Sequence, residues 1–314
     1  MGILVRILEN PEEIAEVEDL QRVVWPGSEL DIIPAHLLLT AAHNGGMVIG
    51  AYEEESDDSE MESAGHSGIG ANSALRLVGA VFGFLGLYST ADGQRLKHCS
   101  HILAVHPNYR NQGIGFSLKR AQWQLVRQQG VDLITWTYDP LLSRNAHLNI
   151  TRLGGVCGTY LREHYGVMRD GLNAGLPSDR FQLDWWVNSH RVNRRLSRHA
   201  RRPLDLAHYF AAGTAIINPT IIGKDGFPIS ENRLHTDLDA DSLGPEIPLL
   251  LVEIPADFQT LKASRPDLAL EWRIHTRQLF EDLFSRGYLV TDFVYLPGTH
   301  PRSFYVLTHG ESTI

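Results

Sequence analysis

The chain has 314 residues, of which 43% are hydrophobic and 21% charged; this composition excludes a globally disordered protein and leaves room for about two domains. Its net charge of −9 argues against broad nucleic-acid binding. No apolar run reaches the roughly 18 residues of a membrane span, and the amino terminus becomes acidic too early for a signal peptide, so we expect a cytoplasmic protein with no membrane partner. The two cysteines lack the spacing of a zinc site or a disulfide framework.

The first 188 residues predict an alternation of strands and helices that is typical of a mixed sheet with helices on its faces. Apolar runs rich in β-branched residues predict the strands, and apolar positions at helical spacing predict the helices. The expected strands are, in chain order, 3–8, 46–52, 75–89, 98–106, 131–138 and 180–187. The expected helices are 10–25, 34–43, 114–129 and 143–155. We therefore expect an α/β (α+β) domain over residues 1–188.

Two polar segments interrupt or follow this pattern. The acidic stretch 53–73 has almost no apolar residues, and we expect a mobile surface loop there. The basic stretch 189–203 is interpreted as a connector. Its arginines would form a nucleic-acid patch, a solvated helix face or a dock for an acidic surface on the other half of the chain, and the acidic net charge favours the last two.

Residues 204–314 predict a second, smaller α/β segment, with strands within 213–222, 247–255, 288–296 and 303–309 and a helix at 266–286. The two halves share a weak pattern of residue spacing. In each, a helix ends at a glycine and the next strand runs on to a tyrosine and a proline at the same offsets, from Gly130 to Pro140 and from Gly287 to Pro297. A degenerate half-repeat or chance explains this, because glycine and proline are common at such positions.

The stretch 101–115 carries the strongest functional signal. An apolar strand passes into RNQGIG, residues 110–115, and a helical pattern starts at the glycines. Glycines at a helix start let backbone amides approach an anion, and the arginine adds charge-assisted hydrogen bonds, so the expected ligand is a phosphate or pyrophosphate. A P-loop would need a lysine after the glycines, and a dinucleotide fold would need a third glycine, so both fit poorly.

The sequence VHPNYRNQGIGFSLK resembles the acetyl-CoA-binding signature of the GNAT acyltransferase superfamily, and the order of elements over 1–188 fits that fold. The resemblance implies a GNAT-like mixed central sheet flanked by helices, with acetyl-CoA or another acyl-CoA as co-substrate and no metal. More narrowly, WTYDPLLSRNAHLNITRLGG and GLPSDRF resemble an atypical branch with a carboxy-terminal extension. Relatives in that branch are linked with N-succinylamino acid racemase and o-succinylbenzoate synthase enzymes.

The resemblance also implies a role for each matching position. Backbone amides of the glycine turn would cradle the pyrophosphate with support from Arg110, and main-chain groups of the preceding strand would pair with the pantetheine arm. The turn residues are Asn111, Gln112, Gly113, Ile114 and Gly115, and the strand residues are Leu103 and Val105. Asn145 would reach the pantetheine or, alternatively, cap a helix, and Lys119 and Arg120 would contact the adenosine 3′-phosphate.

Acyl transfer to an amine needs a base for the ammonium proton and often an acid for the leaving thiolate. Many relatives use a glutamate on the fourth strand, but Cys99 stands at that position. We assign the base to His101, which strand alternation would place on the same face as Leu103; a half-buried sheet histidine is the alternative. The usual helix tyrosine is replaced by Ile150. Tyr138 is the substitute acid, and packing in the core is the alternative for it.

We therefore expect an acyl-CoA-dependent N-acyltransferase that moves an acetyl or succinyl group to a primary amine, such as an amino acid or similar small molecule, by direct attack. A non-catalytic CoA-binding or regulatory module is the alternative, which the missing tyrosine and glutamate favour. Nucleic-acid binding through the arginines of 190–202 ranks third. The extension would lid the site, mediate a homodimer or complete the sheet, and these alternatives stay open.

Overall fold

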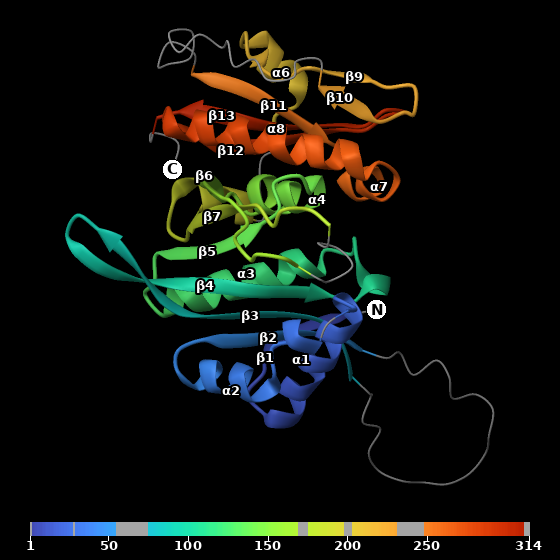
Figure 1. Ribbon diagram of the computed structural model, residues 1–314. Coiled ribbons are helices and arrows are strands. Elements are labelled where there is room, and N and C mark those ends of the chain that lie inside the picture. Colours follow the sequence, from blue (N-terminus) through green and yellow to red (C-terminus); the bar gives the residue numbers. More distant parts are fainter. Residues whose placement is uncertain are drawn as a thin grey trace. The chain divides into compact units, whose positions relative to one another are not determined.

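The computed structural model describes residues 2–27, 29–54, 75–168, 175–197, 203–230 and 248–310 (Figure 1). The chain divides into two compact units, Met1–Val131 and Asp132–Ile314. From residue 55 onward, the expected acidic loop lies outside the described residues. Both units combine helices with strands that pair mostly antiparallel, so the expected mixed α/β class is confirmed.

The first unit is built on four antiparallel strands in the order β1-β2-β3-β4. These strands are β1 (Ile3–Ile7), β2 (Met47–Glu54), β3 (Leu75–Thr90) and β4 (Gly93–Val105). The helices are α1 (Pro11–Val24), α2 (Ala35–His43) and α3 (Ile114–Gln128), with short 3-10 turns η1 (Glu29–Asp31) and η2 (Pro107–Tyr109). Every strand and helix expected in this region is present.

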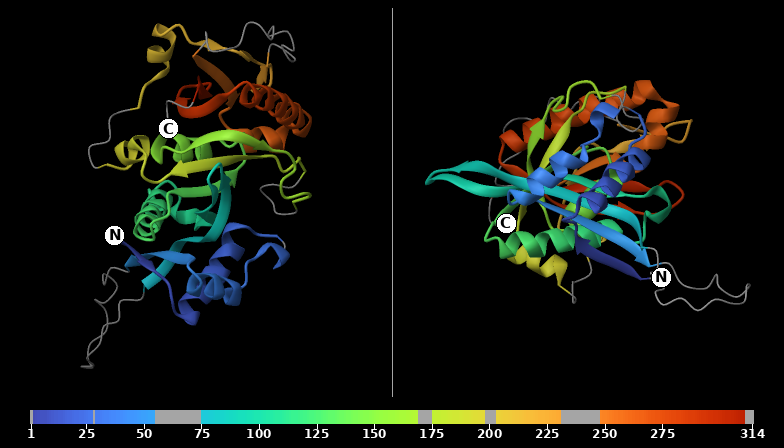
Figure 2. Two further views of the ribbon diagram at one scale, coloured as in Figure 1. Left: turned by 90° about the vertical axis from the view of Figure 1, so that its left-hand side faces the viewer. Right: turned by 90° about the horizontal axis from the view of Figure 1, so that it is seen from below.

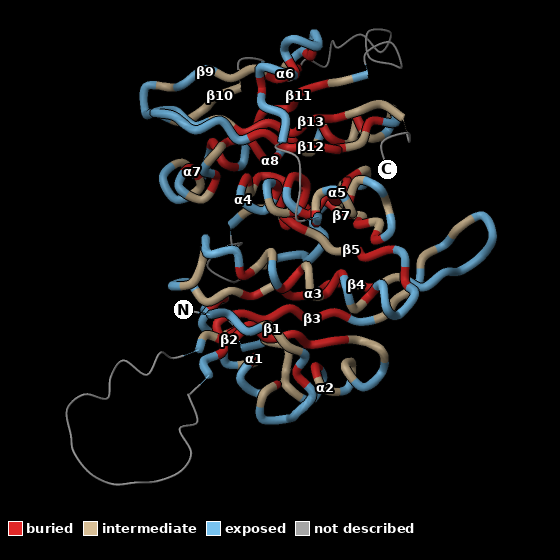
Figure 3. The backbone as a smooth tube through the Cα atoms, turned by 180° about the vertical axis from the view of Figure 1, so that it is seen from behind, coloured by how far each residue is buried: buried red, intermediate tan, exposed pale blue. Residues whose placement is uncertain are grey.

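Helices cover both faces of this four-stranded sheet. Ile14, Val17 and Leu20 recur at helical spacing along α1 and pack with Leu38 of α2 on one face. The other face carries α3, whose start approaches β3 so closely that a Cβ on Gly79 would lie 2.9 Å from Ile114 Cγ2. The buried middle of each inner strand is visible in Figure 3. The sheet therefore presents two different surfaces, one toward α1 and α2 and one toward α3.

The β3–β4 hairpin is longer than its sequence indicates. Pairing between β2 and β3 ends at Met47 and Gly83, but β3 and β4 stay paired as far as Thr90 and Gly93 (Figures 1 and 2). The expected strands 75–89 and 98–106 leave 90–97 as a loop, and this is wrong at residue 90 and over 93–97. A two-stranded ribbon exposed on both faces has no buried face to impose apolar alternation, so its strands are hard to recognise in the sequence.

A β-bulge in β4 changes which residues face each side of the sheet. Phe82 pairs with Ile102 and Gly83 with Ser100, so His101 is the extra residue between the two pairs. Ser100 faces α3, where it accepts a hydrogen bond from Lys119, whereas Ile102 packs in the core under α1 and α2. The bulge breaks the alternation that would place His101 and Leu103 on one face, so that expectation is wrong.

The second unit contains a sheet with the strand order β5-β7-β6-β12-β13-β11-β8 and a separate β9–β10 hairpin. Its strands are β5 (Leu133–Tyr138), β6 (Val156–Leu161), β7 (Arg180–Trp186), β8 (Ala215–Ile216), β9 (Thr220–Ile222), β10 (Pro228–Ser230), β11 (Leu249–Pro255), β12 (Tyr288–Leu296) and β13 (Arg302–His309). Its helices are α4 (Ser143–Ala146), the π-helix η3 (His147–Arg152), α5 (His190–Leu196), α6 (Leu206–Ala211), α7 (Phe258–Ser264) and α8 (Pro266–Ser285). Among the described strand pairs of this unit, β8 pairs parallel with its neighbour β11.

One core joins strands from both sides of the predicted connector. Phe181 of β7 packs edge-to-face on Phe280 of α8, with ring centroids 4.7 Å apart, and β6 pairs with β12 at Cys157 and Val290. In this unit the segments before and after residue 188 share one core. The domain boundary expected at 188 stays a prediction. The half-repeat also stays a prediction, although Gly130 and Gly287 both have a positive φ.

One buried and one partly buried ion pair attach α8 to the loops around β5 and β7. The Arg273 guanidinium donates to both oxygens of Asp139 at 2.9 and 2.5 Å, and Arg277 donates to both oxygens of Asp179 at 2.8 Å. The two arginines are four residues apart and thus lie on one face of α8. The carboxy-terminal segment is thereby fixed to the strands that precede the connector.

Candidate functional site

The start of α3 has the backbone geometry of an anion site. Gly113 is the N-cap of the helix and has a φ of 81°, in the left-handed region that glycine adopts without strain. Asn111, two residues earlier, has a φ of 67°. The first amides of a helix have no preceding helical carbonyl, and the helix dipole favours negative charge there. A Cβ built on Gly113 has no described atom within 4 Å, so the space before the turn is open.

The segment before this turn is attached to the strands of its own unit. The Tyr109 hydroxyl donates a hydrogen bond to Glu53 at the end of β2, and the Arg76 guanidinium lies 5.9 Å from the Tyr109 ring centroid. The buried side chain of Ile114 holds the first turn of α3 against Gly79. No local pattern in the sequence indicates Glu53 and Arg76, because both contact the loop from strands far away in the chain.

The residues expected to meet the phosphates are accessible. Asn111, Gln112 and Gly113 are exposed, and Arg110 is half-buried. Lys119 was expected to contact the 3′-phosphate, and this is wrong. Its side chain is buried, and its Nζ donates to Ser100 Oγ at 2.8 Å and to Gln122 Oε1 at 3.0 Å. Position in the first two turns of a helix does not by itself indicate whether a lysine faces solvent or the sheet.

The strand residues expected to hold the pantetheine lie at the carboxyl end of β4. Leu103 pairs with Val81 and Val105 with Gly79 on β3. Both are half-buried, and η2 and the glycine turn follow directly after Val105. The first unit thus brings the strand end, Arg110 and the helix start together along 15 consecutive residues, from His101 to Gly115.

His101 lies at the bulge with an exposed side chain beside two aromatic rings. Its ring centroid is 6.3 Å from that of Phe82 and 6.1 Å from that of Phe84. Desolvation beside these rings lowers the pKa of His101 below its ordinary value of about 6.5, so most of the imidazole is neutral at pH 7. A neutral imidazole can accept a proton, although the lowered pKa makes it a weaker base.

Two expected site residues belong to the second unit. The Tyr138 hydroxyl lies in the core, 3.4 Å from the Tyr305 hydroxyl and 3.8 Å from Cys157 Sγ, and burial raises its pKa well above the ordinary value. These contacts favour the core-packing alternative for Tyr138. Asn145 is exposed on α4 and is not its cap residue, since α4 begins after Leu142. Ile150 is buried in the core.

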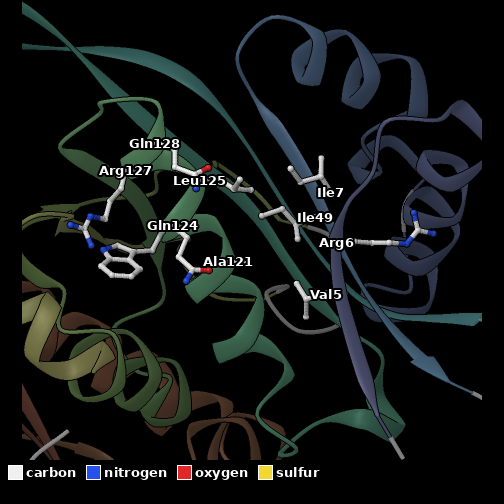
Figure 4. Close-up of a pocket in the computed structure, with 10 residues that line it drawn as sticks. Val5, Arg6, Ile7, Ile49, Ala121, Gln124, Leu125, Arg127 and Gln128 are labelled. Carbon is white, nitrogen blue, oxygen red and sulfur yellow. The ribbon is translucent and has the colours of Figure 1, made fainter. Parts of the chain in front are cut away.

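A groove of about 800 Å³ lies elsewhere in the first unit. Figure 4 shows Val5 and Ile7 of β1 and Ile49 of β2 opposite Leu125 and Ala121 of α3. None of the predicted site residues lines it, and its α3 residues come from the carboxyl-terminal half of the helix. The groove is therefore separate from the anion site at the start of the same helix.

Two arginines in the described part of the basic run contact other elements of the second unit. Arg195 of α5 pairs with Asp292 of β12 at 2.7 Å, and Arg191 donates from Nε to the Gly154 carbonyl at 3.0 Å. These contacts support the docking alternative for the run, of which residues 198–202 lie outside the described part.

Among the described residues, no group of three or more His, Cys, Asp or Glu side chains has the geometry of a metal site. No helix in the described ranges is long and apolar enough to cross a membrane.

Comparison with known proteins finds a family model that matches the part of the chain around this site. Residues 36–148 match the model of the Acetyltransferase (GNAT) family. No curated protein matches the chain. Similar solved structures include a protein described as a GNAT-family acetyltransferase from Desulfovibrio desulfuricans (16% identity, 59% of this chain and 99% of that chain, TM-score 0.40). Others are a GNAT-family acetyltransferase from Streptococcus pneumoniae (14%, 58% and 98%, 0.41) and Arabidopsis thaliana NAA60 in complex with acetyl-CoA (16%, 60% and 100%, 0.44). Residues 36–148 are therefore similar to the GNAT acetyltransferase family, and β4 and the start of α3 lie inside the matched region.

Proposed function

We propose that this chain is an acyl-CoA-dependent N-acyltransferase that transfers an acetyl or succinyl group to the primary amine of a small molecule. The observation that carries the proposal is the left-handed glycine turn at the start of α3, open to solvent and preceded by Arg110, within the region that matches the acetyltransferase family. Such a turn suits a pyrophosphate, and the acyl-CoA thioester supplies the activated acyl group.

Different residues of the chain bind the pyrophosphate and the pantetheine of the acyl-CoA. The amides of residues 111–115 and the Arg110 guanidinium bind the pyrophosphate. Main-chain groups of Leu103 and Val105 bind the pantetheine at the carboxyl end of β4, and the Val105 amide polarises the thioester carbonyl. Asn145 belongs to the second unit, and its contact with the pantetheine stays a prediction from the sequence.

His101 accepts the proton that the amine loses when its nitrogen attacks the carbonyl carbon. The carbon–sulfur bond breaks as the new carbon–nitrogen bond forms, and the thiolate that leaves takes a proton from solvent. The buried Tyr138 hydroxyl stays a candidate acid only if the core around Tyr305 opens, so the proposed route does not depend on it.

One experiment tests the reaction. The full chain is titrated with acetyl-CoA, succinyl-CoA and CoA in a calorimeter, and thiol release is then followed with a panel of amino acids and polyamines. We expect binding of all three and turnover of at least one amine, with turnover lost in His101→Ala while acetyl-CoA affinity stays within about threefold. Absence of binding by all three ligands would contradict the proposal.

The second candidate is a CoA-binding module without catalysis. The observation that favours it is the lack of an accessible acid at the two expected positions, since Ile150 has no ionisable group and Tyr138 is buried in the core of the second unit. This candidate predicts the same binding but no thiol release above the rate of the His101→Ala variant with any amine of the panel.

A further inference from the structure

A buried polar network connects β4 to α3 directly behind the bulge. Lys119 Nζ donates to Ser100 Oγ at 2.8 Å and to Gln122 Oε1 at 3.0 Å, and Gln122 Nε2 lies 3.1 Å from His98 Nε2. All four side chains are buried, with exposed fractions of 0% for His98 and Gln122, 1% for Lys119 and 6% for Ser100. Buried polar groups are costly unless they are satisfied, so the three contacts of this network favour one geometry, although His98 Nδ1 has no hydrogen-bond partner among the described residues.

The protonation state of the network follows from its hydrogen bonds. The Gln122 carbonyl oxygen accepts from Lys119, so its amide nitrogen must donate to His98 Nε2, and the proton of the neutral imidazole then sits on Nδ1. Burial, and to a lesser degree the neighbouring Lys119, lowers the pKa of His98 to about 3. Burial also lowers the pKa of Lys119 well below its ordinary value.

The strand β3 is shaped to admit this network. A Cβ on Gly83 would lie 2.2 Å from His98 Nε2, so only glycine leaves room for the ring. Gly83 also pairs with Ser100 at the first register position beyond the bulge. The network therefore contacts both strands at the point where the register shifts, and Ser100 immediately precedes His101 in the chain.

We propose, building on the proposed acyltransfer, that Lys119, Gln122, His98 and Ser100 form a positioning device that fixes the bulge of β4 against α3. The same helix begins at the anion site, and Gly115 and Lys119 are separated by only four residues, or about 6 Å of helix rise. Fixing Ser100 to Lys119 on one face turns His101 toward Phe82 and Phe84 on the other. The network thereby sets the position of the proposed base relative to the pyrophosphate site.

Three variants separate positioning from a general contribution to stability. Gln122→Met removes both hydrogen bonds of the amide, and Ser100→Ala removes only the hydroxyl on β4. Gln122→Glu is the conservative variant, because its carboxylate accepts from Lys119 while His98 changes tautomer and donates from Nε2. The readouts in the full chain are the pKa of His101 by NMR titration, the tautomer of His98 by NMR, acetyl-CoA affinity by calorimetry and turnover of the amine panel.

We expect His98 to carry its proton on Nδ1 in the native chain. In Gln122→Met and Ser100→Ala the pKa of His101 should rise toward its ordinary value of about 6.5, because the ring leaves the two aromatic side chains. Acetyl-CoA affinity should stay within about threefold, and turnover should fall about 10- to 100-fold, the usual cost of a misplaced reacting group. Gln122→Glu should restore the native His101 pKa and turnover.

The inference is overturned if the pKa of His101 is the same in the native chain, Gln122→Met and Ser100→Ala, however much stability the variants lose. It is also overturned if His98 in the native chain is protonated on Nε2. Failure of the native chain to bind acetyl-CoA, succinyl-CoA or CoA would instead overturn the proposed function, and this outcome is distinguished by the affinity measurement alone.

Discussion

Replacing Gly113 by alanine tests whether the turn at the start of α3 binds the ligand, and Gly130 provides a matched control. Gly113 has a φ of 81° and Gly130, just past the other end of the same helix, a φ of 72°. A Cβ at either position meets no described atom within 4 Å, so the cost of alanine comes from the backbone conformation alone. This cost is about 1–2 kcal/mol for a residue other than glycine.

Both variants should therefore lose about 1–2 kcal/mol of unfolding free energy in urea. Only Gly113→Ala should also lose affinity, since its Cβ occupies the space through which a phosphate approaches the amides. Loss of one hydrogen bond to a charged group, about 1.5–3 kcal/mol, corresponds to acetyl-CoA binding about 10- to 150-fold weaker in calorimetry. Equal affinities of the two variants would refute the reasoning.

Three further predictions concern charged groups. Arg110→Met should weaken acetyl-CoA binding about 10- to 150-fold and reduce its salt dependence, measured by calorimetry at two ionic strengths; native affinity in this variant would contradict a phosphate contact. Burial lowers the pKa of Lys119, so below pH 10.5 the unfolded chain binds a proton that the native chain does not, and the free energy of unfolding rises as the pH rises toward that value. In urea unfolding, Lys119→Met should lack this rise. Parallel plots of unfolding free energy against pH for the native chain and the variant would contradict the prediction. Asp139→Asn should cost about 3–5 kcal/mol in urea by leaving Arg273 buried without its carboxylate, and adding Arg273→Met should recover part of the loss rather than deepen it.

The elements of the first unit were predictable because their burial follows simple periods. Ile14, Val17 and Leu20 mark the buried stripe of α1, and the apolar run of β2 reflects burial on both faces. The glycine turn was predictable for a similar local reason, since Gly113 lies where a strand pattern changes to a helical one. In both cases neighbouring residues in the sequence determine the structure.

The parts that the sequence did not predict depend on contacts between distant segments. The strand Val156–Leu161 was missed because it follows two glycines and is short, and it is completed by pairing with β7 and β12. The bulge at His101 leaves the local pattern of β4 unchanged, so only the register with β3 reveals it. Lys119 and Gln122 resemble surface residues of a helix, and their burial depends on a space that Gly83 of β3 helps to create.

The most direct test of the proposed site is an NMR titration of the 15N-labelled full chain with acetyl-CoA, followed at the backbone amides. The account predicts that the resonances of residues 111–115 shift most, Gly113 and Gly115 among them, while that of Gly130 at the other end of α3 stays in place. Binding of acetyl-CoA that leaves the amides of 111–115 unshifted would contradict the central claim that this turn holds the pyrophosphate.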